Sequence, residues 1–271
     1  MANLDIYCTT VKYFNVLDKL PPYIKPLGLG DFNYPEHWLS EKKGENISHL
    51  NKYYGELTGL YWIWKNKLKN LNGTDWIGNC HYRKLWLNNF YNVKQKISFR
   101  SLYSQLLKSE NKIFFDCDVI QVQPIFLKRE TIFQQFDKVH KNNIIENCVN
   151  FLKDNDKENF TRYLNGNELC GLNMFITKTY LFRKYCESLF PWLEQCFDYC
   201  KRNDLCKGYN TRLPAFLAER YTSYWFSKNE KKKYLSYARL GKVMLSNNIN
   251  KIINPTKIPF TFRMYPTIHD Y

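Results

Sequence analysis

The sequence lacks the short signatures by which many common enzyme classes are recognised. It contains no Gly-x-x-x-x-Gly-Lys-Ser/Thr loop, no Gly-x-Gly-x-x-Gly loop, no Gly-x-Ser-x-Gly nucleophile and no His-Glu-x-x-His pair. These absences argue against the common NTPases, dehydrogenases, serine hydrolases and zinc proteases.

The nine cysteines also lack a metal-binding pattern. None forms a Cys-x-x-Cys pair, and the one cluster, Cys196, Cys200 and Cys206, has no fourth Cys or His nearby. A structural zinc site needs four such ligands. We therefore expect free thiols in a reducing cytoplasm.

Apolar segments are short throughout the chain. No segment approaches the roughly 18 apolar residues that a membrane-spanning helix needs. The N-terminus has no basic segment followed by an apolar one, as a secretion signal would. We expect a protein that is soluble or lies at a membrane surface.

Acidic residues are few compared with basic ones. The chain has 25 Asp and Glu against 40 Lys and Arg, so its formal net charge is +15. Such an excess suits an anionic partner: nucleic acid, an acidic membrane surface or a phosphorylated substrate. Charge alone does not choose among these partners.

Hydrophobic and aromatic residues are plentiful. Hydrophobic residues make up 44% of the 271 residues and aromatic residues 17%, including 21 tyrosines. A chain of this size and composition can bury a large core in one α/β domain or two small ones. Tyrosine rings can stack on sugars or bases, but a core can use as many.

Expected strands alternate with expected helices along the chain. The patterns predict strands at 4–9, 23–28, 76–80, 112–122 and 172–177, helices at 98–109, 129–151, 179–201 and 213–226, and a polar loop at 154–167. This alternation favours an α/β fold with a mostly parallel central sheet. Ligands of such sheets bind beyond the carboxyl ends of the strands, where His81, Tyr82 and Arg83 would lie.

Residues 44–65 predict one helix with two distinct faces. At about 100° per residue, one face is apolar. The other face carries Asn51, Tyr54, Thr58, Trp62 and Lys65. Aromatic and hydrogen-bonding residues on a second face suggest that it covers a ligand or another part of the protein.

Two short groups could bind the phosphates of a nucleotide. Asp116 and Asp118 could hold Mn²⁺ or Mg²⁺, or simply cap a turn and face solvent. Arg83 and Lys84 could bind phosphate oxygens directly, with His81 as a proton donor to the leaving phosphate. The alternative for Arg83 is a structural pair with a buried acid.

A carboxylate on the helix at 213–226 could act as a general base. Glu219 is the first candidate, and Glu56 and Glu168 are weaker ones. The alternative for Glu219 is an ion pair with an arginine.

Basic and apolar residues alternate after residue 226. The non-functional interpretation of residues 227–271 is a solvated, loosely packed extension. The functional interpretation is contact with anionic lipid headgroups.

Several segments together resemble a bacterial family once catalogued only as domain of unknown function four-four-two-two. The matching segments are Tyr7, Thr9 and Lys12, then 44–51, 56–66, His81 to Lys84, 118–120, 173–176 and 218–220. The resemblance covers most of residues 4–226. The family usually has His-Lys where this chain has Val11-Lys12, and a second arginine where it has Lys84.

The resemblance implies a GT-A-like, Rossmann-type nucleotide-sugar-binding domain that transfers a sugar from a UDP-sugar to a growing capsule or O-antigen saccharide. A characterised relative looks like an inverting galactofuranosyltransferase, and this resemblance suggests a furanose donor. We expect one domain at 1–226, with a donor half at about 1–120 and an acceptor half at about 121–226. The expected location is the cytoplasmic face of the inner membrane, where a lipid-linked acceptor would lie.

The resulting assignment of residues is as follows. The donor pocket takes Thr9, Lys12, Asn46, Asn51, Tyr54, Lys65, His81, Tyr82 and Arg83. The acceptor side takes Asn173 and His140, the base is Glu219 or else Asp118, and a metal would use Asp116 and Asp118.

Two other functions fit parts of the sequence. A non-enzymatic nucleic-acid-binding protein would suit the net charge of +15 and the many aromatic residues, but the chain has no such signature and its cations are spread. A catalytically inactive scaffold of the same fold is the other alternative.

Overall fold

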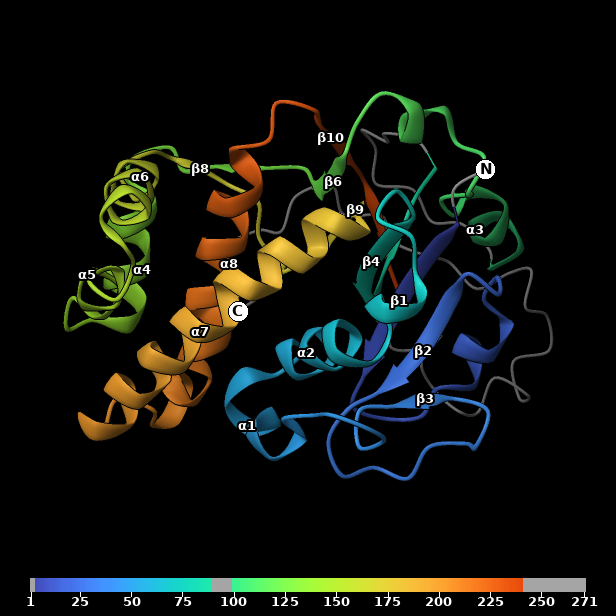
Figure 1. Ribbon diagram of the computed structural model, residues 1–271, viewed down its shortest axis with the longest axis horizontal. Coiled ribbons are helices and arrows are strands. Elements are labelled where there is room, and N and C mark those ends of the chain that lie inside the picture. Colours follow the sequence, from blue (N-terminus) through green and yellow to red (C-terminus); the bar gives the residue numbers. More distant parts are fainter. Residues whose placement is uncertain (1–2, 89–98, 241–271) are drawn as a thin grey trace.

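A central β-sheet organises the domain (Figure 1). The computed structural model describes residues 3–88 and 99–240. Within them the main path of the sheet runs in the order β10-β6-β9-β4-β1-β2-β3. The strands are β1 (Leu4–Thr10), β2 (Ile24–Gly28), β3 (Leu39–Ser40), β4 (Trp76–His81), β6 (Val119–Val122), β9 (Phe175–Lys178) and β10 (Lys232–Leu235), with β5 (Lys84–Trp86) and β11 (Tyr237–Arg239) beside them. A separate ribbon pairs β7 (Ile125–Phe126) with β8 (Glu168–Leu169).

The direction of the strands brings two strand ends together. β1 is parallel to both β2 and β4, and its Thr9 is level with His81 of β4. Along the main path of the sheet, only β9 departs from the parallel arrangement, since it is antiparallel to β4 and β6. The predicted mostly parallel sheet is therefore confirmed, and the residues after β1 and β4 share one edge.

Eight α-helices accompany the sheet in the described residues. They are α1 (Asn51–Tyr54), α2 (Leu57–Asn66), α3 (Phe99–Gln105), α4 (Ile132–His140), α5 (Ile144–Val149), α6 (Asp154–Leu164), α7 (Thr179–Arg202) and α8 (Leu213–Ser227). Short 3₁₀ helices include η4 (Lys112–Phe115) and η5 (Gly208–Arg212). In Figure 1, α4, α5 and α6 gather at one end of the molecule, beyond α7 and α8. None of the helices in these ranges is long and apolar enough to span a bilayer.

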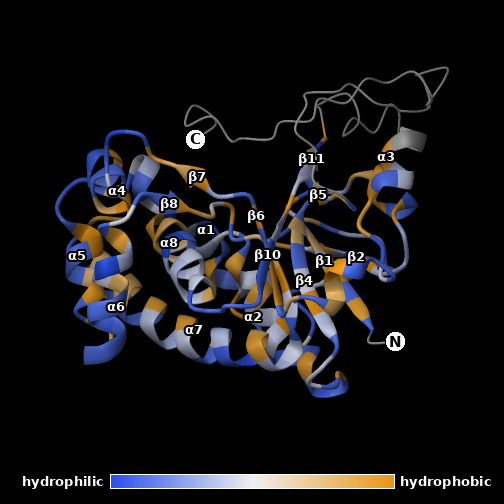
Figure 2. Ribbon diagram, turned by 90° about the horizontal axis from the view of Figure 1, so that it is seen from above, coloured by the Kyte–Doolittle hydropathy of each residue, from blue (hydrophilic) through white to orange (hydrophobic). Residues whose placement is uncertain are grey.

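The sheet separates two apolar cores. Successive residues of a strand point to opposite faces. Tyr7 accordingly packs with α2, α7 and α8, whereas Ile6 and Cys8 pack on the other face with Trp38 and Trp86. The central strands appear largely hydrophobic in Figure 2, as expected when both faces are covered.

The single helix predicted over residues 44–65 is wrong, because the chain breaks at Gly55. This glycine has φ +54° and ψ −129°, a conformation that side-chain-bearing residues rarely adopt. Asn51 bridges the break by donating to the Thr58 hydroxyl at 2.9 Å. The second face predicted for this helix is therefore divided between α1 and α2.

The predicted helix over 129–151 is also interrupted. Lys141, Asn142 and Asn143 all have positive φ, between 50° and 61°, and separate α4 from α5. Asparagine tolerates this conformation better than most residues. The start of α4 follows its sequence, since Thr131 and Gln134 form a reciprocal capping box.

The polar loop predicted at 154–167 is in fact mostly helix α6. Phe160 and Leu164 lie one turn apart and are both buried, whereas the rest of the helix is largely polar. Asp154 and Asp156 in the first turn stabilise the helix through their interaction with its dipole. A narrow apolar stripe is therefore enough to hold this helix.

Other boundaries also differ from the sequence prediction, and the strand predicted at 172–177 begins only at Phe175. The first half of the strand predicted at 112–122 forms η4, capped by the Asn111 side chain. The sheet also continues past residue 226, because β10 pairs with β6 and β11 pairs with β5. The basic segment after residue 226 thus begins inside the folded domain, and 241–271 lies outside the described residues.

Candidate functional site

A cavity of about 640 Å³ opens beyond the carboxyl ends of β1 and β4. Residues from six parts of the chain line it: 9–11, Leu29, 51–52 with 55–56, 81–84, 172–173, and five residues between 209 and 219. Four cationic side chains (Lys52, Arg83, Lys84 and Arg212) and two carboxylates (Glu56 and Glu219) face it. The cavity therefore combines a net positive charge with possible proton acceptors.

His81 joins two strand ends at the floor of the cavity. Its Nε2 lies 2.7 Å from the Leu172 carbonyl oxygen, which can only accept, so Nε2 carries a hydrogen. Its Nδ1 lies 3.3 Å from the Thr9 hydroxyl. Burial lowers the pKa of His81, although the Glu56 carboxylate acts in the opposite direction. A neutral His81 thus donates a hydrogen bond from Nε2 to the Leu172 carbonyl. Transfer of this proton to a leaving phosphate would break that hydrogen bond.

Glu56 lies at the start of α2 and faces the cavity. It accepts a hydrogen bond from the Asn173 amide at 2.9 Å and forms an ion pair with Arg212 at 3.0 Å. Burial opposes its charge, but the charge of Arg212 and the hydrogen bond from Asn173 act in the opposite direction, and its pKa is lowered. Its side chain is 19% exposed and that of Arg212 is 51% exposed, so this pair is open to solvent.

Glu219 is held more tightly than Glu56. One oxygen accepts from the Leu172 backbone N–H at 2.6 Å, and the other accepts from Arg220 at 2.6 Å. Arg220 also donates to Gln135 at 2.6 Å. The side chains of Glu219 and Arg220 are only 7% and 6% exposed. The ion pair considered as the alternative for Glu219 is therefore present.

A strained turn lies between these groups. Leu172 and Asn173 both have positive φ, +81° and +49°, which is unfavourable for a residue such as leucine. Glu219 holds the Leu172 N–H, His81 holds its carbonyl, and Asn79 donates to the Asn173 carbonyl at 2.7 Å. The surrounding side chains thus fix the turn that presents Asn173 to Glu56.

The tight turn between β4 and β5 supplies the cationic end. His81 pairs with Lys84 across the turn, and Leu240, which follows β11, donates its backbone N–H to the Arg83 carbonyl at 2.8 Å. The Arg83 side chain is exposed and its guanidinium lies 5.2 Å from the centre of the Tyr82 ring. Burial lowers the pKa of Lys84 to about 8, against the opposing effect of Glu219.

The cavity gathers nine of the residues that the sequence indicated: Thr9, Asn51, Glu56, His81, Tyr82, Arg83, Lys84, Asn173 and Glu219. Arg212 and Tyr209 were missed. Both come from a short segment before α8 that carries no motif, so only the tertiary structure reveals them.

Four residues assigned to the donor pocket do not line this cavity. Tyr54 is buried against Phe197, and Lys65 pairs with Glu45 at 3.3 Å. Asn46 accepts hydrogen bonds from Ser48 in the loop before α1. Lys12 is exposed just outside the rim. The break at Gly55 explains why Tyr54 does not line the cavity, because the break turns α1 out of line with α2.

Asp116 and Asp118 lie at the opposite edge of the sheet. Val119 and Ile77 both pair with Thr177, so Asp118 is level with the start of β4. His81 lies five residues farther along, or about 17 Å. Asp118 is therefore not part of this cavity. Among the described residues no group of three or more His, Cys, Asp or Glu could hold a metal ion, and the two cavity glutamates are paired with arginines.

His140 lies behind the cavity wall and does not line it. It is 3% exposed and packs against Phe136 and Phe216, with ring centres 4.3 and 4.7 Å away. Burial lowers its pKa to about 4, so the ring is neutral at physiological pH. Its predicted contact with an acceptor would have to be indirect.

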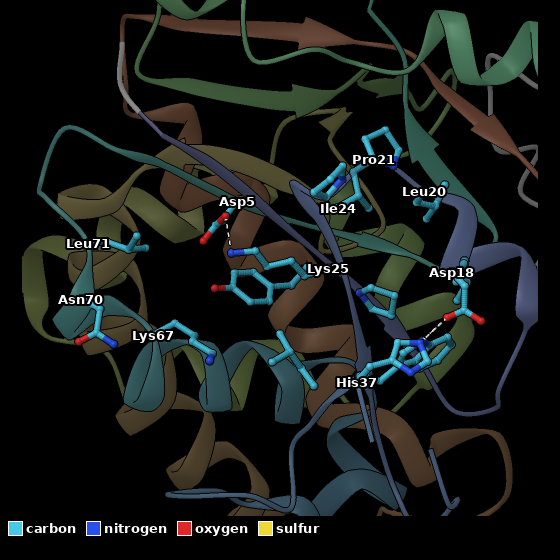
Figure 3. Close-up of a pocket in the computed structure, with 16 residues that line it drawn as sticks. Asp5, Asp18, Leu20, Pro21, Ile24, Lys25, His37, Lys67, Asn70 and Leu71 are labelled. Carbon is cyan, nitrogen blue, oxygen red and sulfur yellow. Dashed lines mark hydrogen bonds and ion pairs between the residues drawn. The ribbon is translucent and has the colours of Figure 1, made fainter. Parts of the chain in front are cut away.

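A second cavity of about 640 Å³ lies beside β2 (Figure 3). Asp5 from the first half of β1 pairs there with Lys25 at 2.6 Å, and His37 lies 3.0 Å from Asp18. Its carboxylates are thus matched by basic groups of the same cavity. It does not contain the residues that the sequence indicated for the donor.

Comparison with known proteins agrees with this architecture. Residues 5–231 match the family described as "Domain of unknown function (DUF4422)". Among solved structures, the chain is similar to the WbbM bifunctional glycosyltransferase in its apo form, with a TM-score of 0.64 and 17% identity over 89% of this chain. The chain spans 46% of the length of that protein, and no curated protein matches it. The expected GT-A-like fold is therefore confirmed.

Proposed function

The chain belongs to the DUF4422 family, and on this premise we propose that it is a glycosyltransferase that moves a sugar from a UDP-sugar to a saccharide. The observation that carries the proposal is the cationic cavity beyond β1 and β4, with two carboxylates inside it. In α/β sheets this edge is the usual ligand site. The likeness of the fold to a glycosyltransferase supports the same conclusion.

Arg83 and Lys84 bind the pyrophosphate of the donor in this proposal. Arg83 offers a planar pair of donors for phosphate oxygens, and Lys84 adds a compact charge. Both stabilise the negative charge that grows on the departing UDP. No step is assigned to Mn²⁺ or Mg²⁺, because the cavity carboxylates are already occupied by arginines.

The proton of the acceptor hydroxyl passes to a cavity carboxylate, and we assign this role to Glu56 in place of Glu219. Both oxygens of Glu219 already accept hydrogen bonds, one from the Leu172 N–H and one from Arg220. Glu56 shares its charge with the half-exposed Arg212, which can turn toward solvent. A single base opposite the leaving group suits an inverting displacement.

The finer features of the proposal come from the family resemblance. They are a furanose donor such as UDP-galactofuranose, a growing capsule or O-antigen as acceptor, and action at the cytoplasmic face of the inner membrane. A lipid-linked acceptor would suit that location, and the net charge of +15 supports attraction to its anionic lipids.

A thermal-shift screen tests the donor. UDP and UDP-sugars in pyranose and furanose forms are added with and without manganese, since a ligand that binds the folded state raises the melting temperature. We expect UDP to stabilise the wild type and the Arg183→Ala control, whose arginine is exposed on α7 outside the cavity. The Arg83→Ala variant should lose most of this shift. Equal shifts in all three proteins would contradict the proposal.

A turnover assay tests whether Glu56 acts as the general base. The assay measures the release of UDP from the UDP-sugar that raises the melting temperature most in the thermal-shift screen. Methyl glycosides serve as acceptors. We expect Glu56→Gln to reduce turnover by about 10²- to 10⁴-fold while UDP still binds. Unchanged turnover in this variant would exclude Glu56 as the base.

A further inference from the structure

One exposed aromatic ring faces the cavity from η5. Tyr209 is 51% exposed and lines the cavity together with Phe216 of α8. An exposed aromatic ring that faces a cavity can stack against a ligand there. The mechanism proposed above makes no use of this ring.

The neighbours of Tyr209 cover only one side of it. Its ring centre lies 5.2 Å from that of Phe216 and 5.8 Å from that of His140, with planes inclined by 20° and 16°. The centres of Phe216 and His140 are themselves only 4.7 Å apart. Rings stacked on opposite faces of Tyr209 would be about twice as far from one another. Both neighbours therefore lie on the same side, and the other face is open.

Residues on either side of Tyr209 anchor the chain segment that carries the ring. Asn210 exchanges two hydrogen bonds with His140, one between side chains at 2.8 Å and one to the His140 carbonyl at 3.1 Å. Arg212 pairs with Glu56 at 3.0 Å. The chain segment that carries the ring is thus anchored to His140 before any ligand arrives, which reduces the entropy lost on binding.

We propose that the open face of Tyr209 is the acceptor subsite, on which a sugar ring of the saccharide stacks through its C–H face. The proposal rests on the function proposed above. Arg212 joins the Tyr209 segment to Glu56, and Phe216 precedes Glu219 on α8 by three residues, a rise of about 4.5 Å. A sugar ring on Tyr209 would therefore lie beside the cavity carboxylates. The predicted role of His140 becomes that of a neutral support behind the ring.

Saturation-transfer NMR on the full chain tests this subsite. Methyl glycosides of galactose, glucose, mannose, rhamnose and N-acetylglucosamine, and methyl galactofuranoside, are offered at millimolar concentration with saturating UDP. We expect ring-proton signals from at least one glycoside. These should fall about tenfold in Tyr209→Ala, the loss of roughly one stacking contact, and persist in Tyr209→Trp. The control Tyr180→Ala removes a ring of similar exposure on α7, outside the cavity, and should change nothing.

UDP affinity measured on the same samples separates the two proposals. Equal glycoside signals in wild type and Tyr209→Ala, or none in the wild type, would overturn the acceptor subsite. So would a parallel loss of UDP and glycoside binding in Tyr209→Ala, which would mean that the uracil ring occupies this face. Glycoside binding that depends on Tyr209 in a protein that does not bind UDP would support the subsite and overturn the donor assignment.

Discussion

Lys84 is the residue whose charge should make donor binding depend on pH. Its pKa is lowered to about 8, so it loses its proton as the pH rises from 7 to 9. The phosphates of UDP are fully ionised over this range. We expect the affinity for UDP to fall about tenfold, the worth of a weak charge-assisted hydrogen bond.

Isothermal titration of UDP between pH 7 and pH 9 measures this effect. The Lys84→Arg variant is the matched control, because arginine stays charged over the whole range. A wild-type affinity that does not change with pH, or changes equally in Lys84→Arg, would remove Lys84 from the phosphate site.

Glu219 and Arg220 should matter for stability whatever their part in catalysis. Removing one partner of a buried ion pair leaves the other charge uncompensated, at a cost of about 3–5 kcal/mol. We therefore expect Glu219→Gln to lower the free energy of unfolding in urea by about this amount. Glu56→Gln should cost less, since its arginine is half exposed. Similar losses in both variants would contradict the difference in burial.

The sequence predicted some site residues and missed others for a physical reason. His81, Tyr82 and Arg83 could be placed because they follow directly on a buried strand, where ligands of α/β sheets bind. The pairing of Glu56 with Arg212 spans 156 positions and leaves no trace in local spacing. Contacts of this kind follow from the fold and from no motif.

Among the helices and strands, the junction of α1 and α2 should be sensitive to substitution. Gly55 has a backbone conformation open mainly to glycine, and a methyl group there would lie 2.1 Å from the Arg212 guanidinium. We expect Gly55→Ala to lower the free energy of unfolding by about 1–3 kcal/mol and to displace Arg212 from Glu56.

Urea unfolding of Gly55→Ala and Gly73→Ala measures this cost. Gly73 is a suitable control, because a methyl group there meets only Tyr180 at 3.8 Å and its φ is not positive. Equal stability of the two variants would show that the junction tolerates a side chain.

The elements that the sequence predicted well are those with continuous patterns. Strands β1, β2 and β4 and helices α7 and α8 begin and end close to their predicted limits. The errors lie where the backbone takes positive φ without a marked signal, as at Lys141, or where a polar helix buries only a narrow stripe, as in α6. Burial against the rest of the fold, which local sequence does not show, decides these cases.

The chain as a whole carries a charge that should bring it to anionic membranes. We expect the full chain to sediment with vesicles that contain phosphatidylglycerol at low salt and to be released at high salt, because exposed charges are screened. Neutral phosphatidylcholine vesicles are the control. Equal binding to both kinds of vesicle, or to neither, would contradict the proposed membrane location.

In the proposed mechanism the pyrophosphate of the donor binds in the cavity beyond β1 and β4. A crystal structure of the full chain with UDP would show where the phosphates lie. We predict phosphate oxygens within hydrogen-bonding distance of Arg83 and Lys84, at the turn that follows β4. UDP in the cavity beside β2, or at the edge that carries Asp118, would contradict this account.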